Sequence, residues 1–143
     1  GIEGASRFLS RVWRLFMEEK EVSCKSPDCC GAVGSIAYLT DVSFIPEESF
    51  SLIRKAVGRP DHLVIDGLRI LEHSTHFSFE QALAAADRIN ARNVYLTHIT
   101  HNLFHWQVQE FVDAIIDRYP NLLAARKAGG YVGPAWDGLV IEC

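Results

Sequence analysis

The amino-acid sequence predicts an α/β protein, and three observations support this fold class. Short apolar runs rich in β-branched and aromatic residues recur along the chain, as expected of buried strands. Amphipathic segments with helical periodicity lie between these runs, and this alternation is typical of βαβ units in a parallel sheet. The length of 143 residues and the apolar fraction of 48% suffice for one globular core.

The first βαβ unit begins with a β-prone apolar run at residues 35–40. A helix is expected over 47–57, because Pro46 suits the first turn of a helix and Gly58 suits its end. The apolar run 62–66 is then the second strand.

The second unit repeats this pattern. Ser78 and Gln81, three residues apart, match a capping box and predict a helix that runs to about residue 90. Residues 93–97 follow as the third strand.

The C-terminal part is predicted to hold one more helix and one more strand. The helix covers 104–119 and should stop at Pro120. Its aromatic side chains are expected on the core face, namely Phe104, Trp106 and Phe111. A turn at Asp137–Gly138 leads into a closing strand at 139–142.

The N-terminal part differs from the rest. Residues 5–19 place apolar side chains at helical spacings and predict an amphipathic helix. A stretch rich in glycine and cysteine follows, so we divide the chain into 1–33, a helix with a cysteine-containing linker, and 34–143, the βαβ domain. The spacing of Cys24, Cys29 and Cys30 favours free thiols, with a three-cysteine zinc site as the alternative.

Composition excludes several classes of protein. With 14 basic and 18 acidic residues the net charge is −4, which argues against non-specific binding of nucleic acid. No apolar run reaches the ~20 residues of a membrane span, and three arginines near the start interrupt any signal-peptide pattern. We therefore expect a cytoplasmic protein without membrane association.

Ligand-type side chains follow the predicted strands at their carboxyl ends. Asp41, Asp66 and His98 each end or directly follow a strand. The loops beyond them hold further histidines, namely His73, His76, His101 and His105. Ligands bind at this edge in open α/β sheets, and zinc and manganese accept Asp and His ligands. From spacing alone, ordinary polar loop residues remain an equal alternative.

Several motifs together resemble a known family. They are Tyr38-Leu-Thr-Asp41, Leu63-Val-Ile-Asp66-Gly-Leu-Arg69, His73-Ser-Thr-His76-Phe-Ser-Phe-Glu-Gln-Ala82, Tyr95-Leu-Thr-His98-Ile-Thr-His101 and Ala135-Trp-Asp-Gly-Leu-Val-Ile-Glu142. In order and spacing, residues 34–143 resemble the C-terminal half of metallo-β-lactamase-fold hydrolases of the phosphoribosyl cyclic phosphate phosphodiesterase branch. The resemblance implies half of an αββα sandwich, here with an extra N-terminal helix, and hydrolysis of a small phosphodiester.

The resemblance also implies roles for individual residues. Asp41 resembles the carboxylate that bridges two metal ions, and His98 resembles a terminal metal ligand. His76 resembles the active-site histidine that donates a proton to the leaving oxygen, a role suited to imidazole at neutral pH. Asp66, His73 and His101 are the candidates for supporting positions around this site. Trp136 stands where the family usually has tyrosine, which we interpret as a packing change.

One family motif is missing from the chain. The His-x-His-x-Asp-His motif, which supplies most metal ligands in the family, has no counterpart here. With Asp41 and His98 as the carried-over ligands, we expect the site to be incomplete and this chain alone to lack full catalytic competence. Zinc or manganese should then be bound substoichiometrically or not at all.

The first residues resemble a second family. Gly1 to Phe16 is similar to the leucyl-tRNA synthetase segment that leads into the anticodon-binding bundle. The chain thus resembles a fusion of two pieces, or a truncated protein. An amphipathic helix that needs a packing partner is the preferred interpretation, because one helix cannot form an anticodon site.

Three functions therefore stand as hypotheses. The first is a metal-dependent phosphodiester hydrolase with an incomplete site, and the second is a non-catalytic oligomerisation or interaction domain. The third, an accessory tRNA-binding fragment, is disfavoured by the net charge. Half of a sandwich would leave one apolar sheet face uncovered, so we also expect a homodimer in which sheet packs on sheet.

Overall fold

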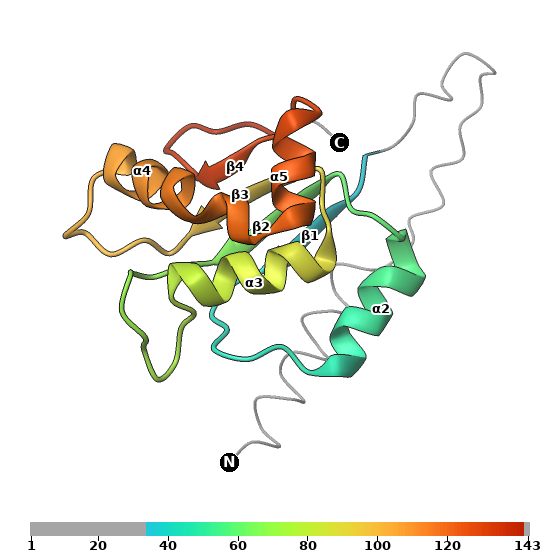
Figure 1. Ribbon diagram of the computed structural model, residues 1–143. Coiled ribbons are helices and arrows are strands. Elements are labelled where there is room, and N and C mark those ends of the chain that lie inside the picture. Colours follow the sequence, from blue (N-terminus) through green and yellow to red (C-terminus); the bar gives the residue numbers. More distant parts are fainter. Residues whose placement is uncertain (1–33, 142–143) are drawn as a thin grey trace. The chain divides into compact units, whose positions relative to one another are not determined.

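The computed structural model of the chain describes residues 34–141, which form an α/β domain (Figure 1). One sheet contains the strands β1 (Ile36–Leu39), β2 (His62–Asp66), β3 (Asn93–Thr97) and β4 (Val132–Pro134). The strands lie in the order β1-β2-β3-β4, and all neighbouring pairs are parallel. The α/β fold class predicted from the sequence is confirmed.

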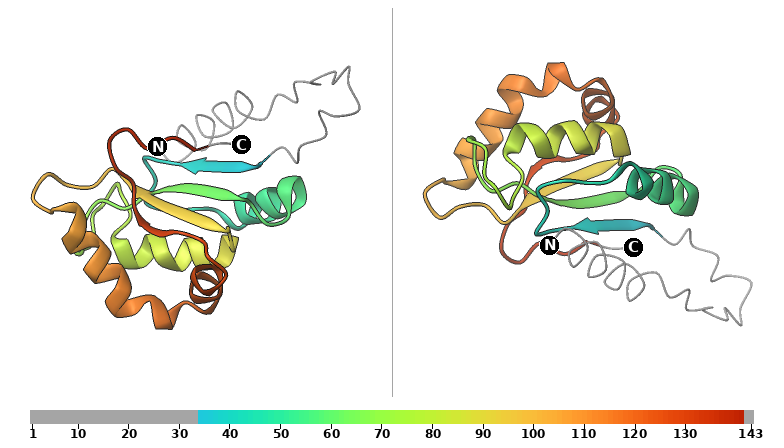
Figure 2. Two further views of the ribbon diagram at one scale, coloured as in Figure 1. Left: turned by 90° about the horizontal axis from the view of Figure 1, so that it is seen from above. Right: turned by 90° about the horizontal axis from the view of Figure 1, so that it is seen from below.

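The described helices connect the strands as crossovers. They are α2 (Glu47–Val57), α3 (Phe79–Ile89), α4 (His105–Ile115), the 3-10 turn η2 (Ile116–Arg118) and α5 (Pro120–Lys127). Because the strands follow one another in chain order, right-handed crossovers carry their helices to the same side of the sheet. Figures 1 and 2 show α3, α4 and α5 on one side, with α2 packed beside α3.

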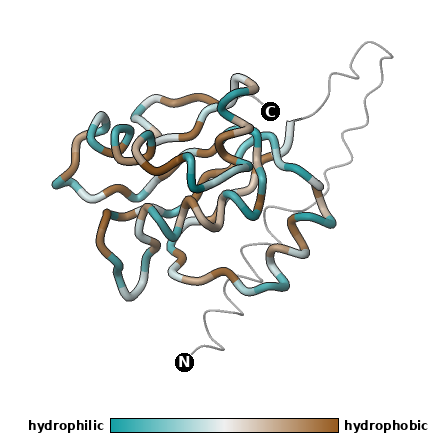
Figure 3. Tube along the Cα trace, in the orientation of Figure 1, coloured by the Kyte–Doolittle hydropathy of each residue, from teal (hydrophilic) through white to brown (hydrophobic). Residues whose placement is uncertain are grey.

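The core lies between the sheet and these helices. Alternate strand residues point into it, and α3 contributes Phe79 and Leu83, both fully buried. Fully buried strand residues are Leu63, Ile65, Val94 and Leu96. Burying each side chain of this size stabilises the fold by about 1.5–3 kcal/mol. Figure 3 shows the corresponding hydrophobic segments through the middle of the domain and an alternation of polar and apolar residues along α2.

The start of α3 confirms the capping box. The Ser78 backbone N–H donates to Gln81 Oε1 at 2.9 Å, and the Gln81 backbone N–H donates to Ser78 Oγ at 3.3 Å. The predictions for the helix at 47–57 and for the strands at 62–66 and 93–97 also match the structure.

The helix predicted over 104–119 is confirmed in part: α4 and η2 cover residues 105–118, but a further helix follows that the sequence did not predict. The helix α4 ends at Ile115, and Pro120 is the first residue of α5. Proline is tolerated there because the first N–H groups of a helix have no partner within the helix. The carboxylate of Asp87 accepts hydrogen bonds from the backbone N–H groups of Asn121 and Leu122 at 2.8 and 3.1 Å, and so caps α5 from α3.

The last strand also lies elsewhere than predicted. The sheet is extended by residues 132–134, whereas the described residues 139–141 are not in a strand. A Val-Gly-Pro sequence does not resemble a strand, but proline is tolerated in an edge strand. Gly133 pairs with Tyr95, and a Cβ on it would meet Gln109 Oε1 and the Tyr131 hydroxyl, so these side chains would have to shift. The predicted turn at 137–138 is present.

Two of the three aromatic residues expected in the core are exposed. The exposed fractions of Phe104 and Trp106 are 68% and 57%, and their rings stack with centroids 6.4 Å apart. Both lie at the start of α4, which extends past the end of β4 in Figure 1. Phe111, one to two turns later, contacts Phe79 in the core as expected.

Polar groups tie the amino ends of the strands together. Asp61, just before β2, accepts hydrogen bonds from the Ser35 backbone N–H at 3.0 Å and from Ser35 Oγ at 2.9 Å. These hydrogen bonds, with a smaller contribution from Arg92 at 3.2 Å, lower the pKa of Asp61. Asn93 links this group onward, because its Nδ2 donates to the Asp61 carbonyl and its Oδ1 accepts from the Tyr131 N–H.

The sheet face turned away from the helices is only partly exposed. On β1, Ile36 and Tyr38 are about half exposed, whereas Val64 and Tyr95 are buried. Tyr38 and Tyr95 flank Val64 in the same row of the sheet, which accounts for part of its burial. Within residues 34–141 no helix is long and apolar enough to cross a membrane.

Several predictions fall outside the described residues. They concern the N-terminal helix at 5–19 with its synthetase resemblance, and the cysteines Cys24, Cys29 and Cys30. The division at residue 33 and the cytoplasmic location likewise stay predictions.

Candidate active site

Three candidate residues meet at the carboxyl edge of the sheet. Asp41 follows β1, His98 follows β3, and His76 comes from the loop between β2 and α3. One ligand atom from each of the three lies within 4.8 Å of the others. The fold therefore brings together the three residues that the family resemblance singles out. Their individual roles as metal ligands and proton donor stay predictions.

The backbone is strained at two of these positions. Asp41 and His98 have φ angles of 57° and 61°, in the left-handed region that non-glycine residues rarely adopt. Such a conformation costs on the order of 1 kcal/mol at each residue. Asp41 lies two residues after β1 and His98 lies directly after β3, and both strained residues are candidate ligands.

Asp66 contacts the cluster formed by Asp41, His76 and His98. Its side chain is 0% exposed. Its Oδ2 accepts hydrogen bonds from His76 Nδ1 at 2.7 Å and from the Val42 backbone N–H at 3.0 Å. Its Oδ1 is buried without a hydrogen-bond partner among the described residues, and His98 Nδ1 is 3.7 Å away. Buried charges are normally paired or bound to metal, and His76 and His98 are the described side chains that form ion-pair contacts with this carboxylate.

The contact with Asp66 fixes the histidine beside it. An ionised carboxylate can only accept, so His76 Nδ1 carries the proton and its Nε2 is left for a ligand or substrate. The His76 ring lies 4.4 Å from that of His98, centroid to centroid, and its side chain is 18% exposed. The sequence predicted Asp66 near the site. Its hydrogen bond with His76 depends on tertiary structure, and no spacing in the sequence indicates it.

The loop that carries His76 is held at both ends. Phe77 donates its N–H to the Val42 carbonyl and accepts from the Leu68 N–H, both at 2.9 Å. Within the loop, the Arg69 guanidinium donates to the carbonyls of Leu71 and Glu72 at 3.2 and 2.9 Å. These hydrogen bonds restrict the loop and so limit the positions that the imidazole can take.

The remaining candidates lie farther out. The ring of His73 is 5.5 Å from that of His76, and its Nδ1 contacts Thr75 Oγ1 at 3.2 Å. His101 is exposed and makes no described contact with the cluster. His105 is engaged elsewhere, because its Nε2 donates to the Pro134 carbonyl oxygen at 3.2 Å.

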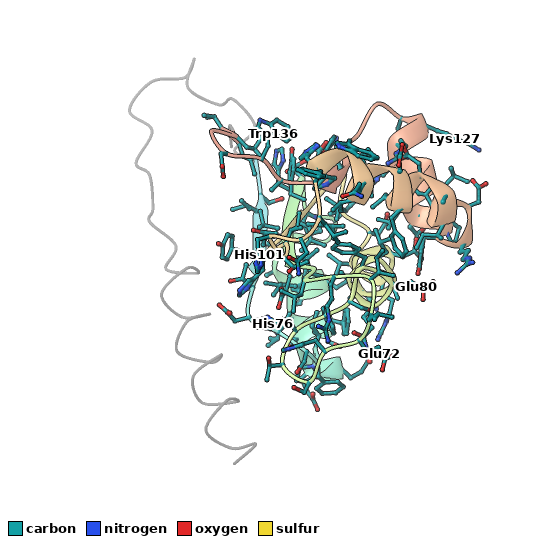
Figure 4. The ribbon with its side chains drawn as sticks, turned by 90° about the vertical axis from the view of Figure 1, so that its left-hand side faces the viewer. Glu72, His76, Glu80, His101, Lys127 and Trp136 are labelled. Carbon is teal, nitrogen blue, oxygen red and sulfur yellow. The ribbon has the colours of Figure 1, made fainter. Side chains whose placement is uncertain are left out.

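A pocket of about 460 Å³ has Ile99, the residue after His98, in its lining. Residues after β3 and β4 line it, namely Ile99, Thr100, His101, Leu103, His105, Ala135, Trp136 and Asp137. Figure 4 shows His76, His101 and Trp136 along the same side of the domain. The interpretation of Trp136 as a packing residue is wrong in part, because its side chain is 48% exposed and lines this pocket.

The residues of the cluster fit a divalent metal ion. Asp41 offers a carboxylate oxygen, and His76 and His98 each offer an imidazole nitrogen, which are donors that zinc and manganese accept. The unpartnered Oδ1 of Asp66 adds negative charge close to His98. This donor set and this charge both favour a cation at the edge of the sheet.

Comparison with known proteins gives one family match and one similar solved structure. The family model for the beta-lactamase superfamily domain matches residues 28–99, which is half of the chain. A crystal structure of a diphosphatase from the PhnP family is 39% identical over 52% of this chain, with a TM-score of 0.46. This chain spans 28% of the length of that protein. No curated protein matches the chain significantly.

Proposed function

The chain belongs to the beta-lactamase superfamily domain family, and from this premise we propose that it is a metal-dependent hydrolase of phosphodiesters. The observation that carries the proposal is the joining of Asp41, His76 and His98 at one edge of the sheet, within 4.8 Å of one another. The motif resemblance supports the phosphodiester as substrate, since the same three residues align with the family's site.

In this proposal His76 acts as the proton donor. Asp66 holds the imidazole through Nδ1 at 2.7 Å, so in this proposal Nε2 is the nitrogen that carries the proton to the leaving oxygen. Asp66 also stabilises the positive charge of a protonated His76, because its carboxylate is buried and close. Asp66 is thus a positioning residue, and His76 is the catalytic residue.

Asp41 and His98 would hold the metal in this proposal. A divalent ion bound there supplies Lewis-acid activation of water and of the phosphoryl group. The chain lacks the histidine-rich motif of the family, so few of its own ligands hold the ion and we propose that binding is weak. A slow reaction that needs an excess of metal follows from this.

Hydrolysis of bis(p-nitrophenyl) phosphate by the 143-residue chain with millimolar Mn²⁺ tests the proposal. We expect slow, metal-dependent release of p-nitrophenol that falls about 10²–10⁴-fold in His76→Ala. His62→Ala is the matched control, because His62 lies at the amino end of β2, and it should keep the wild-type rate. Equal rates for wild type and His76→Ala, or no metal-dependent hydrolysis at all, would contradict the proposal.

A second candidate function is assembly through the sheet. The exposed apolar side chains of Ile36 and Tyr38 lie on the edge strand β1, and sheet-on-sheet packing of two copies would cover them. An interface of the obligate kind buries more than about 2,000 Å² in total. Light scattering should then give a dimer at micromolar concentration, whereas a stable monomer would eliminate this candidate.

A further inference from the structure

We propose that the pocket lined by Ile99 and Trp136 binds an aromatic heterocycle of the nucleobase type, carried by the organic part of the substrate. The proposed function is needed only to call the bound molecule a substrate, because binding of the heterocycle requires no reaction. The pocket starts at Ile99, the residue after His98. A molecule whose phosphate lies at the cluster would therefore place an attached group at or near this pocket.

Charge determines which part of a phosphate ester the pocket accepts. Neither lysine nor arginine is among the residues that line it, and Asp137 contributes a carboxylate. An anionic phosphate is bound best by arginine, lysine or backbone N–H groups, so this lining disfavours a second phosphate. A neutral group with N–H donors suits it, because Asp137 has no described ion pair or hydrogen bond and can accept.

Shape and exposure favour a flat ring. The Trp136 indole is half exposed, and the rings of Tyr131 and His105 stand at 78° to it, 5.7 and 6.2 Å away. Neither neighbour stacks on the indole, so the two hold it edge to face and leave parallel stacking to a ligand. Leu103 adds apolar surface, and a volume of about 460 Å³ lies in the range of small-molecule sites.

A matched pair of probes isolates the heterocycle. Adenosine 5′-monophosphate and ribose 5-phosphate differ only in the base, and NMR titration of the 143-residue chain gives the affinity of each. We expect the monophosphate with adenine to bind about tenfold more tightly, because stacking of one base on an aromatic side chain contributes that much. Shifts should centre on the Trp136 indole N–H.

Substitutions show whether Trp136 carries the preference for the adenine compound. Trp136→Ala should remove the preference for the adenine compound and leave ribose 5-phosphate binding unchanged, whereas Trp136→Tyr, which keeps an aromatic ring, should retain most of it. Trp106→Ala is the matched control, since Trp106 is also exposed but stacks on Phe104 outside the pocket. If Trp136→Ala does not fold, the position of the shifts in the wild-type chain still tests the proposal.

Equal affinities for the two probes, or a preference that survives in Trp136→Ala, would overturn the pocket assignment. That failure differs from failure of the proposed function. Hydrolysis that depends on His76 without a preference for adenine would remove the pocket alone. A preference for adenine without such hydrolysis would remove the phosphodiesterase proposal and leave the pocket.

Discussion

At the amino ends of the strands the carboxylate of Asp61 has donors on both oxygens, from Ser35 and Arg92. At the carboxyl ends of the same strands the carboxylate of Asp66 is fully buried, and its Oδ1 has no described donor. The carboxyl edge also contains the two strained residues Asp41 and His98. The carboxylate at the amino end thus has hydrogen-bond donors, whereas the carboxyl end combines an unsatisfied buried oxygen with strained backbone. Such departures are expected where a protein binds ligands.

Removing the charge of each carboxylate should affect different properties. Asp66→Asn keeps the shape but weakens the hold on His76, and we expect phosphodiester hydrolysis to fall about 10²–10⁴-fold. Asp61→Asn should leave the rate unchanged, because Asp61 lies at the opposite end of the sheet. Rate measurements on both variants, with circular dichroism as a check on folding, decide this. A normal rate for Asp66→Asn would break the distinction between the two ends.

Packing at the amino end should tolerate little change. A Cβ on Gly130 would lie 2.1 Å from the Arg92 carbonyl oxygen and 2.9 Å from that of Ala125. We expect Gly130→Ala to lower the free energy of unfolding by about 3 kcal/mol in urea titrations. Gly58→Ala, with φ 64° but nothing within 4 Å, should cost only about 1 kcal/mol. Equal losses would mean that the backbone contact at Gly130 relaxes freely.

The Asp61 network should make stability depend on pH. Hydrogen bonds from Ser35 lower the pKa of Asp61 in the folded protein, so the folded state binds this proton less readily than the unfolded chain does. The stabilisation is therefore present above the ordinary aspartate value near ~4 and is lost as the pH falls through the lowered folded value. Urea titrations should show Asp61→Asn less stable than wild type at pH 7, with a smaller difference at pH 3. A difference that grows towards low pH would contradict this sign.

Relief of strain at the carboxyl edge should give the smallest effect. Asp41 is largely exposed and has a φ of 57°, so Asp41→Gly should raise the free energy of unfolding by about 0.5–1 kcal/mol. Asn90→Gly is the control, since Asn90 has a φ of 61° as the C-cap of α3 and lies outside the site. Loss of stability in Asp41→Gly beyond that of Asn90→Gly would show that Asp41 holds the fold together.

The sequence was most informative where local signals and tertiary structure agree. The structure contains α3, β2 and β3 where the sequence predicts them. The capping box of Ser78 and Gln81 marks the start of α3, and apolar runs mark the two strands. The edge strand β4 contains glycine and proline and depends on pairing with β3, so no local pattern reveals it. Pro120 marked a boundary, but α5 begins there because Asp87, far along the chain, caps it.

The candidate site likewise has residues that the sequence predicts and contacts that it does not. Asp41, Asp66 and His98 were predictable because each stands at the end of an apolar run, and parallel strands bring those ends together. The hydrogen bond between Asp66 and His76 and the exposure of Trp136 were not, because both depend on how a loop folds over the edge of the sheet.

The central claim is that the carboxyl edge binds a divalent cation through Asp41 and His98, next to His76. Titration with Mn²⁺, which prefers oxygen and imidazole ligands over thiolates, followed by paramagnetic broadening of NMR signals, tests it most directly. We predict broadening centred on these three residues at one ion per chain, reversed by a chelator, abolished in the Asp41→Ala, His98→Ala double variant and absent around Asp61. Broadening centred elsewhere, or unchanged in that variant, would contradict the assignment of this edge as the metal site.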